Sequence, residues 1–410
     1  MKAIKSPIAI LPNVIKVPAV KRSERMTELL AREPFRVFFP LATLSGMVGV
    51  ALWPLNLLGI IAMYPGQFHA RIMAHGLFGG FIVGFLGTAM PRMLSAQKLK
   101  PFEVIPLLVA HMAAVAAYAT GHLQIGNALF LSLLIGFGGV MAGRLKSRKD
   151  MPPPGFVLVA FSLLSAAAGA FLGLFDFAAT NPQLVTLDHL LSYQGFALFP
   201  ILGVGPFILP RFYGLNSAHD LPESLAPSKA WIRKAAFATS VGVLIFVSFV
   251  FEAKAFIRAA YAIRFLAAAG YILAEMPLKK GPAGFSVFGA AIRISLIGIV
   301  AGLGAIVFAP AYRVALLHIT LVGGFAVITF VVATRVLFGH SGNLSKLKGR
   351  NRWFPTAVVL MLFGMATRIS GDFVPKIMAS HYIYGAIVWI VGVTIWAFYA
   401  LPKALIADEE

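Results

Sequence analysis

Residues 313–337 read RVALLHITLVGGFAVITFVVATRVL, an almost unbroken apolar run that contains a single histidine. An α-helix rises about 1.5 Å per residue and the hydrocarbon core of a bilayer is about 30 Å thick, so this segment is long enough to cross a membrane. Strands of membrane β-barrels alternate apolar and polar residues, which this segment does not do. It therefore predicts a membrane-spanning α-helix.

Similar stretches recur along the whole chain of 410 residues, of which 59% are hydrophobic and 12% charged. Soluble domains carry about 25% charged residues. We therefore predict an all-α integral membrane protein, a single bundle of about twelve transmembrane helices, with a basic segment 1–37, a transmembrane domain 38–402 and a tail 403–410. The predicted helix cores are 38–62, 71–91, 101–120, 125–143, 155–175, 186–209, 230–250, 255–276, 287–308, 313–337, 354–372 and 381–401.

Lys and Arg exceed Asp and Glu by 35 − 15 = 20. The excess is concentrated in alternate connections, including 144–154 and 339–353, and in the N-terminal segment. By the positive-inside rule these parts face the cytoplasm. We expect a multi-pass protein of the bacterial inner membrane with both termini cytoplasmic. The charge then reflects topology and attraction to the lipid bilayer, and no nucleic acid is expected as a partner.

The placement of the nine histidines is the strongest functional signal. One histidine inside a membrane helix is most often a hydrogen-bonded packing residue. Six share the outer third of the predicted membrane, which favours ligation of haem iron or copper. The six are His69, His75, His122, His189, His318 and His381, of which His122 is the most easily explained as a surface residue. The absence of cysteine excludes disulfides, iron–sulfur clusters and covalently attached c-type haem.

Intramembrane arginines add to this layer. Arg71 precedes His75 by four residues, and Arg264 and Arg368 also lie within predicted helices. Guanidinium groups suit haem propionates, although each could instead pair with a carboxylate. His189 and Tyr193 are spaced i and i+4, which resembles the copper-ligand helix of the haem–copper oxidases and makes a bundle of that type one option. We treat these two as catalytic candidates.

Four segments resemble the NnrS family: 317–324 (LHITLVGG), 333–342 (ATRVLFGHSG), 68–73 (FHARIM) and 84–91 (GFLGTAMP). The sequence departs from the family pattern at Arg71, where the family has a second histidine, and at Ile72, where it has glutamate. His75 could replace the missing ligand. His340 matches the pattern, but lies about 33 Å along the helix from His318, so it cannot share a metal with it and is expected to cap the helix.

The resemblance implies a haem- and copper-containing membrane protein linked to nitric oxide and nitrosative stress. The expected cofactors are haem b and copper, although the sequence does not fix the haem type. His75 and His318 are the expected haem ligands, and Arg71, Arg264 and Arg368 the other cofactor-binding residues. The candidates for copper or a second haem are His69, His189 and His381.

The expected function is reduction or detoxification of nitric oxide, with electrons from an unidentified donor. The inner halves of the predicted helices are almost entirely apolar, so protons are expected from the outer face. The alternatives are a secondary transporter and a haem-loaded sensor or assembly factor without turnover. A transporter normally has carboxylates near the membrane midplane, and none is evident here.

The absence of native cysteine makes the topology directly testable. Cysteines introduced as Arg148→Cys and Lys348→Cys should react with a membrane-impermeant maleimide only from the cytoplasmic side, because both lie in predicted cytoplasmic loops. Lys254→Cys, in a predicted outer connection, should react from outside intact cells. Outside labelling of the first two variants would contradict the predicted orientation.

Overall fold

The computed structural model describes residues 22–177, 180–276, 286–347 and 351–406, and all regular elements within them are helical. The α-helices are α1 Arg22–Arg32, α2 Phe35–Leu57, α3 Gly66–Arg71, α4 Gly79–Met93, α5 Pro101–Ala119, α6 Leu123–Lys146, α7 Phe156–Leu172, α8 Pro182–His189, α9 Phe196–Phe212, α10 Lys229–Ala253, α11 Ile257–Glu275, α12 Val287–Phe308, α13 Arg313–His318, α14 Val327–Gly339, α15 Trp353–Phe373 and α16 Met378–Ala400. The π-helices are η1 Ile72–Phe78, η2 Leu190–Gly195 and η4 Ile319–Ala326, and short 3-10 turns are η3 Pro310–Tyr312, η5 Leu344–Leu347, η6 Pro375–Ile377 and η7 Leu401–Leu405.

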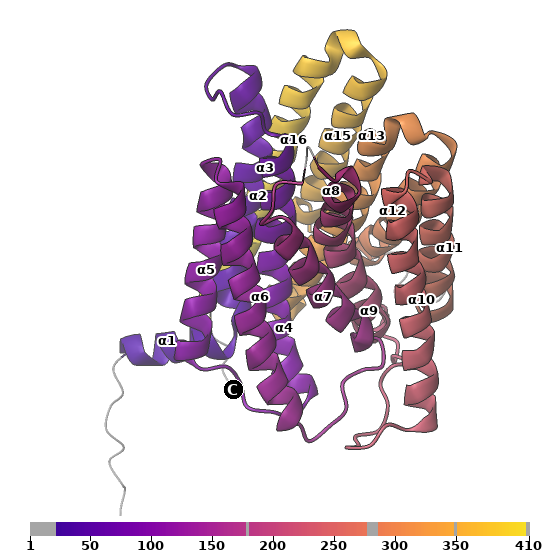
Figure 1. Ribbon diagram of the computed structural model, residues 1–410. Coiled ribbons are helices and arrows are strands. Elements are labelled where there is room, and N and C mark those ends of the chain that lie inside the picture. Colours follow the sequence, from indigo (N-terminus) through magenta and orange to yellow (C-terminus); the bar gives the residue numbers. More distant parts are fainter. Residues whose placement is uncertain (1–21, 178–179, 277–285, 348–350, 407–410) are drawn as a thin grey trace, which may run out of the picture.

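The helices form one upright bundle, with α1 lying across one end of it (Figure 1). Among the described residues, eleven helices are long and apolar enough to cross a membrane. The shorter apolar helix α7 occupies the position of the remaining predicted span. The predicted all-α membrane bundle is confirmed.

Three spans are built differently from the others. The second (α3, η1, α4), sixth (α8, η2, α9) and tenth (α13, η4, α14) each contain a π-helical segment. These three also pack against one another: η1 contacts η2 and α9, α9 contacts η4, and α14 contacts α4. They form the centre of the bundle, and the arrangement recurs at every fourth span.

Each π-helix packs closely on the span that precedes it, α2, α7 or α12. A glycine of the earlier helix faces the π-helix at each contact, and an added Cβ would press on the neighbouring side chain. The facing pairs are Gly49 with Ile72, Gly169 with Ser192 and Gly302 with Thr320. Small residues let membrane helices approach closely, which compensates for the lack of a hydrophobic driving force in lipid.

Helix α9 contains Pro200, Pro206 and Pro210. A proline has no N–H, so the carbonyl four residues earlier loses its helical partner, which is costly where no water is available. Hydroxyl groups of neighbouring residues replace two of these bonds. Ser162 Oγ donates to the carbonyl of Phe196 at 2.7 Å, and Ser217 Oγ donates to the carbonyl of Pro206 at 2.8 Å.

The end of the bundle at which α4 and α14 finish, called here the basic face, is tied together by Glu33. Its carboxylate accepts from Arg36 Nε at 2.7 Å and lies 2.7 Å from Nδ1 of His340; Arg92 also donates to it. His340 is the residue that follows α14, in keeping with its predicted capping position. Lys149 N also donates to the carbonyl of Leu94 at this end.

The predicted cytoplasmic loops 144–154 and 339–353 therefore lie on one face of the bundle. Residues 348–350 of the second loop and both chain termini lie outside the described residues. Which side of the membrane this face occupies stays a prediction.

The Glu33 cluster gives a pH-dependent stability. Burial raises the pKa of Glu33, but the hydrogen bond and charge of His340 and the charge of Arg36 outweigh it and lower the pKa from 4.5 to about 2. The stabilisation is therefore complete above pH 4.5 and is lost as the pH falls toward 2. Glu33→Gln should lower the melting temperature in detergent at pH 7, by less as the pH falls below 4.5.

The matched control is Glu28→Gln, which removes the exposed pair with Arg32 and should change the melting temperature little. A pH-independent difference between Glu33→Gln and the wild type would contradict the role assigned to this carboxylate.

Candidate functional site

A cavity of about 460 Å³ lies between the second, sixth and tenth spans, at the end of the bundle opposite the basic face. Three of the predicted histidines line it: His69, His189 and His318. We call it the histidine chamber. Its volume falls in the range of ordinary ligand and cofactor pockets, roughly 300–1,000 Å³.

His69 and His318 are held in the same way. Nδ1 of His69 lies 2.9 Å from the carbonyl oxygen of Gly49, and Nδ1 of His318 lies 2.7 Å from that of Val314. A carbonyl can only accept, so in each neutral ring the proton is on Nδ1 and Nε2 keeps a free lone pair. Metal-ligating histidines are typically oriented by such a bond. Both rings are therefore prepared to ligate through Nε2.

His189 and Tyr193 also line the chamber, and their rings stack with centroids 5.2 Å apart. The Tyr193 hydroxyl is buried and has no hydrogen-bond partner. Asp188, next to His189, is held by Arg71, which also donates to Ser192 at 2.7 Å. The predicted spacing thus brings an imidazole and an uncommitted phenol together at one wall.

The three predicted arginines have different positions. Arg71 and Arg264 do not line the chamber; each is almost fully buried and paired with a carboxylate, Asp188 or Glu252. Both guanidinium groups therefore lie behind the chamber wall and pair with carboxylates, which is the alternative to propionate binding considered for them above. Arg368 does line the chamber, where it pairs with Asp372 at 2.8 Å. Arg313 lines the chamber as well.

The structure does not bring His75 or His381 to the chamber. His75 is 1% exposed and faces α5 and α6, where its ring stacks on Phe130 at 3.8 Å. Its Nδ1 donates to the Tyr118 hydroxyl at 2.8 Å, since that hydroxyl gives its own proton to Asn127. The structure thus joins His318 with His69 in one cavity, and not with His75. His381 lies on α16, with Nδ1 3.1 Å from the Ile377 carbonyl.

Several polar and aromatic residues of the chamber were not predicted from the sequence. Glu252 is the most important, because it is 5% exposed, lines the chamber and accepts from both Arg264 and Arg313. The signal available in the sequence was a carboxylate at the end of a long apolar stretch, since ionisable residues in membrane helices usually mark a functional site. The others are Trp53, Tyr64, Gln194, Tyr261, Tyr382 and Trp389. They carried no such signal, since aromatic residues and amides are common in membrane helices.

The donor set suits some cofactors better than others. Within the described residues, no group of three or more His, Cys, Asp or Glu side chains is arranged to hold a metal ion. His69 and His318 each present a free Nε2, and a neutral imidazole is a ligand that haem iron would accept. Guanidinium groups of Arg313 and Arg368 and largely apolar and aromatic walls complete a setting that fits a haem.

The buried ion pair behind the chamber can be tested through stability. Arg264 is 0% exposed and donates to Glu252 at 2.9 Å, Gln194 at 2.5 Å and Ser248 at 3.0 Å. Arg264→Met leaves buried acceptors unpaired and should cost about 3–5 kcal/mol. The control is Arg258→Met, an exposed residue of the same helix, with a change within about 0.5 kcal/mol. Equal thermal stability of the two variants would show that the pair has no structural role.

Comparison with known proteins supports the resemblance seen in the sequence. The sequence model of the NnrS protein family matches residues 29–406, nearly the whole chain. No curated protein matches. The chain, a multi-pass helical membrane protein with a histidine chamber between its three central spans, belongs to the NnrS family, which links it to nitric oxide.

Proposed function

We propose that the histidine chamber binds a haem and acts on nitric oxide, reducing or otherwise detoxifying it under nitrosative stress. The observation that carries the proposal is the pair of chamber histidines, His69 and His318, whose Nδ1–H groups are fixed by carbonyls and whose Nε2 atoms are free. One of these two imidazoles would hold the iron, and Arg313 and Arg368 would hold the propionates. A bound haem would supply an iron that takes up nitric oxide and accepts electrons.

The chain's own residues would supply protons. Reduction of two nitric oxide molecules to nitrous oxide consumes two electrons and two protons and releases one water. Tyr193 has an uncommitted hydroxyl in the chamber, stacked on His189. We assign the proton-donating position to Tyr193 Oη, with His189 and the Arg71–Asp188 pair orienting it. The electron donor is unidentified, and the proposed setting is the bacterial inner membrane.

Copper is the second proposed cofactor. His189 is the chamber histidine left for it once His69 and His318 are assigned to haem. A second function, haem-loaded sensing without turnover, is favoured by one observation: the Glu252 carboxylate of the chamber is committed to ion pairs with Arg264 and Arg313. A chamber whose carboxylate is taken up in ion pairs suits gas binding without turnover, and turnover measurements separate the two functions.

The proposal is tested by the visible spectrum and metal content of the purified protein, followed by nitric oxide consumption with an artificial electron donor. His69→Ala and His318→Ala should each abolish or shift the haem bands. His75→Ala should keep them, because His75 faces away from the chamber. Tyr193→Phe should keep the spectrum and slow turnover.

His122→Ala, at an exposed site, is the control for these histidine variants. A wild-type spectrum in both His69→Ala and His318→Ala would refute the haem assignment. A haem protein that binds nitric oxide without consuming it would favour sensing.

A further inference from the structure

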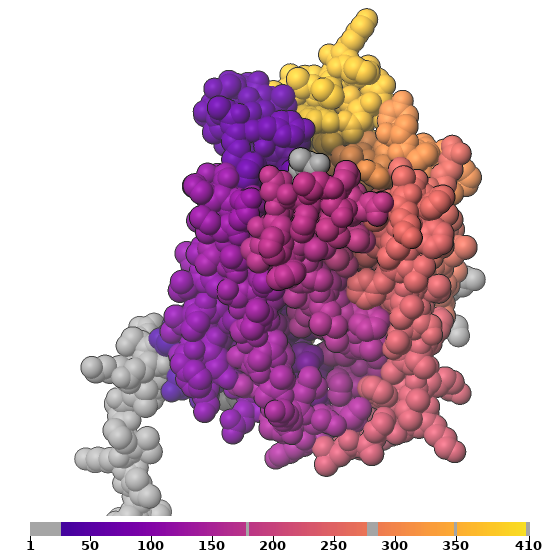
Figure 2. Space-filling view, in the orientation of Figure 1, coloured from indigo at the N-terminus to yellow at the C-terminus, as the bar shows by residue number. Residues whose placement is uncertain are grey.

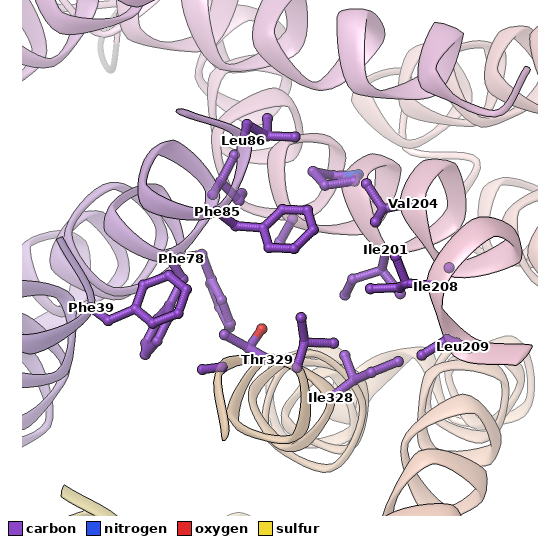
Figure 3. A pocket seen from close by; sticks show the side chains of 17 residues that line it. Phe39, Phe78, Phe85, Leu86, Ile201, Val204, Ile208, Leu209, Ile328 and Thr329 are labelled. Carbon is purple, nitrogen blue, oxygen red and sulfur yellow. The ribbon is translucent and has the colours of Figure 1, made fainter. Parts of the chain in front are cut away.

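A second cavity lies between the same three central spans, closer to the basic face (Figure 3). Its volume is about 90 Å³, and its walls come mainly from α4, α9 and α14. Figure 3 shows side chains converging on it from several sides, among them Phe78, Phe85, Ile201, Val204 and Ile208. We call it the apolar chamber. On α9 its wall runs from Ala197 to Leu209, about 18 Å along the helix.

Water has little to bind in the apolar chamber. Thr329 carries the polar side-chain group of its wall, and that hydroxyl already donates to the Phe325 carbonyl at 2.7 Å. A buried water needs two to four polar partners, and apolar cavities without them stay dry and bind apolar guests such as xenon. Such a space suits a small apolar guest, because its walls offer no free polar partner to a quinone head group or to haem propionates.

The two chambers share Phe78, which lines both. Phe78 ends η1, and its ring lies edge-on to Phe325 of η4, with centroids 6.2 Å apart. The side chain thus stands between the apolar chamber and the histidine chamber. The molecular surface is hollowed in its lower half, where Figure 1 places α4 and α9 (Figure 2).

We propose that the apolar chamber takes up a small apolar gas and passes it to the histidine chamber beside Phe78. The identity of the gas as nitric oxide rests on the proposed function. Nitric oxide dissolves in the bilayer and needs no polar partner, whereas the histidine chamber is lined by Glu252, Arg313 and Arg368 at its polar side. The gas then arrives through apolar walls and the protons through the polar end, so the two routes are separate.

The first test uses xenon as the probe. Crystals of the complete protein pressurised with xenon should show anomalous density among Ile201, Val204 and Val332. Ile201→Phe fills the space from α9 and Val332→Phe from α14, so each should remove that density. Two variants on different helices guard against a folding defect in one. Ile297→Phe, on the lipid-facing side of α12 with 61% exposure, is the matched control and should keep the density.

The second test measures the association rate of nitric oxide with the reduced protein after flash photolysis. The filled variants Ile201→Phe and Val332→Phe should bind several-fold more slowly, and Ile297→Phe at the wild-type rate. Absence of xenon from the wild type overturns the apolar chamber as a gas site. Xenon binding with unchanged association rates in the filled variants overturns the route. Xenon binding without any nitric oxide binding refutes the proposed function and supports the gas chamber itself.

Discussion

A bilayer offers no hydrogen-bond partner to a backbone N–H or C=O, and the whole architecture follows from this constraint. A helix broken into a loop leaves backbone groups without a partner unless neighbouring protein or water supplies one. The three central spans instead contain π-helical segments, in which i→i+5 bonds keep the backbone paired while one residue is added. Each added residue turns the later side chains by about 100° around the axis. His189 and His318 immediately precede such segments, so the histidine chamber is formed where the helices change register.

Buried charge is the second constraint on this fold. Arg71 and Arg264 are almost inaccessible, and a single charge in that setting would be prohibitive without a partner. Their pairing with Asp188 and Glu252 places the charges behind the chamber wall and fixes the residues that do face it, Tyr193 and Gln194. A buried pair adds little net stability, but the two pairs, together with Arg313 on Glu252, tie the chamber wall to the second, sixth, seventh, eighth and tenth spans. Loss of one partner leaves the other charge buried and unpaired, so it is expected to disturb both the fold and the site.

The fold was predictable because each span carries its own strong signal, a long apolar run. The site was predictable only in depth. Counting residues placed His69, His75 and His318 in one layer, but it did not say which side of the helix each occupies. The second span is buried on nearly all sides and apolar all round, so it has no amphipathic pattern to reveal its facing direction. His75 therefore looked equivalent to His69, although it faces α5 and packs on Phe130.

The central spans also divide the interior into a polar part and an apolar part. The histidine chamber has charged and phenolic groups on its walls, whereas the apolar chamber has the already bonded hydroxyl of Thr329. An apolar, dry segment about 18 Å long resists proton passage, because a proton needs a chain of hydrogen-bonded groups. The same segment admits a neutral gas at little cost. A protein that consumed protons in the histidine chamber would then take them from the side of the membrane on which that chamber lies, and would pump none across. The prolines of α9 fit this division, since Ser162 and Ser217 satisfy two of the carbonyls that they free, and neither serine lines the apolar chamber.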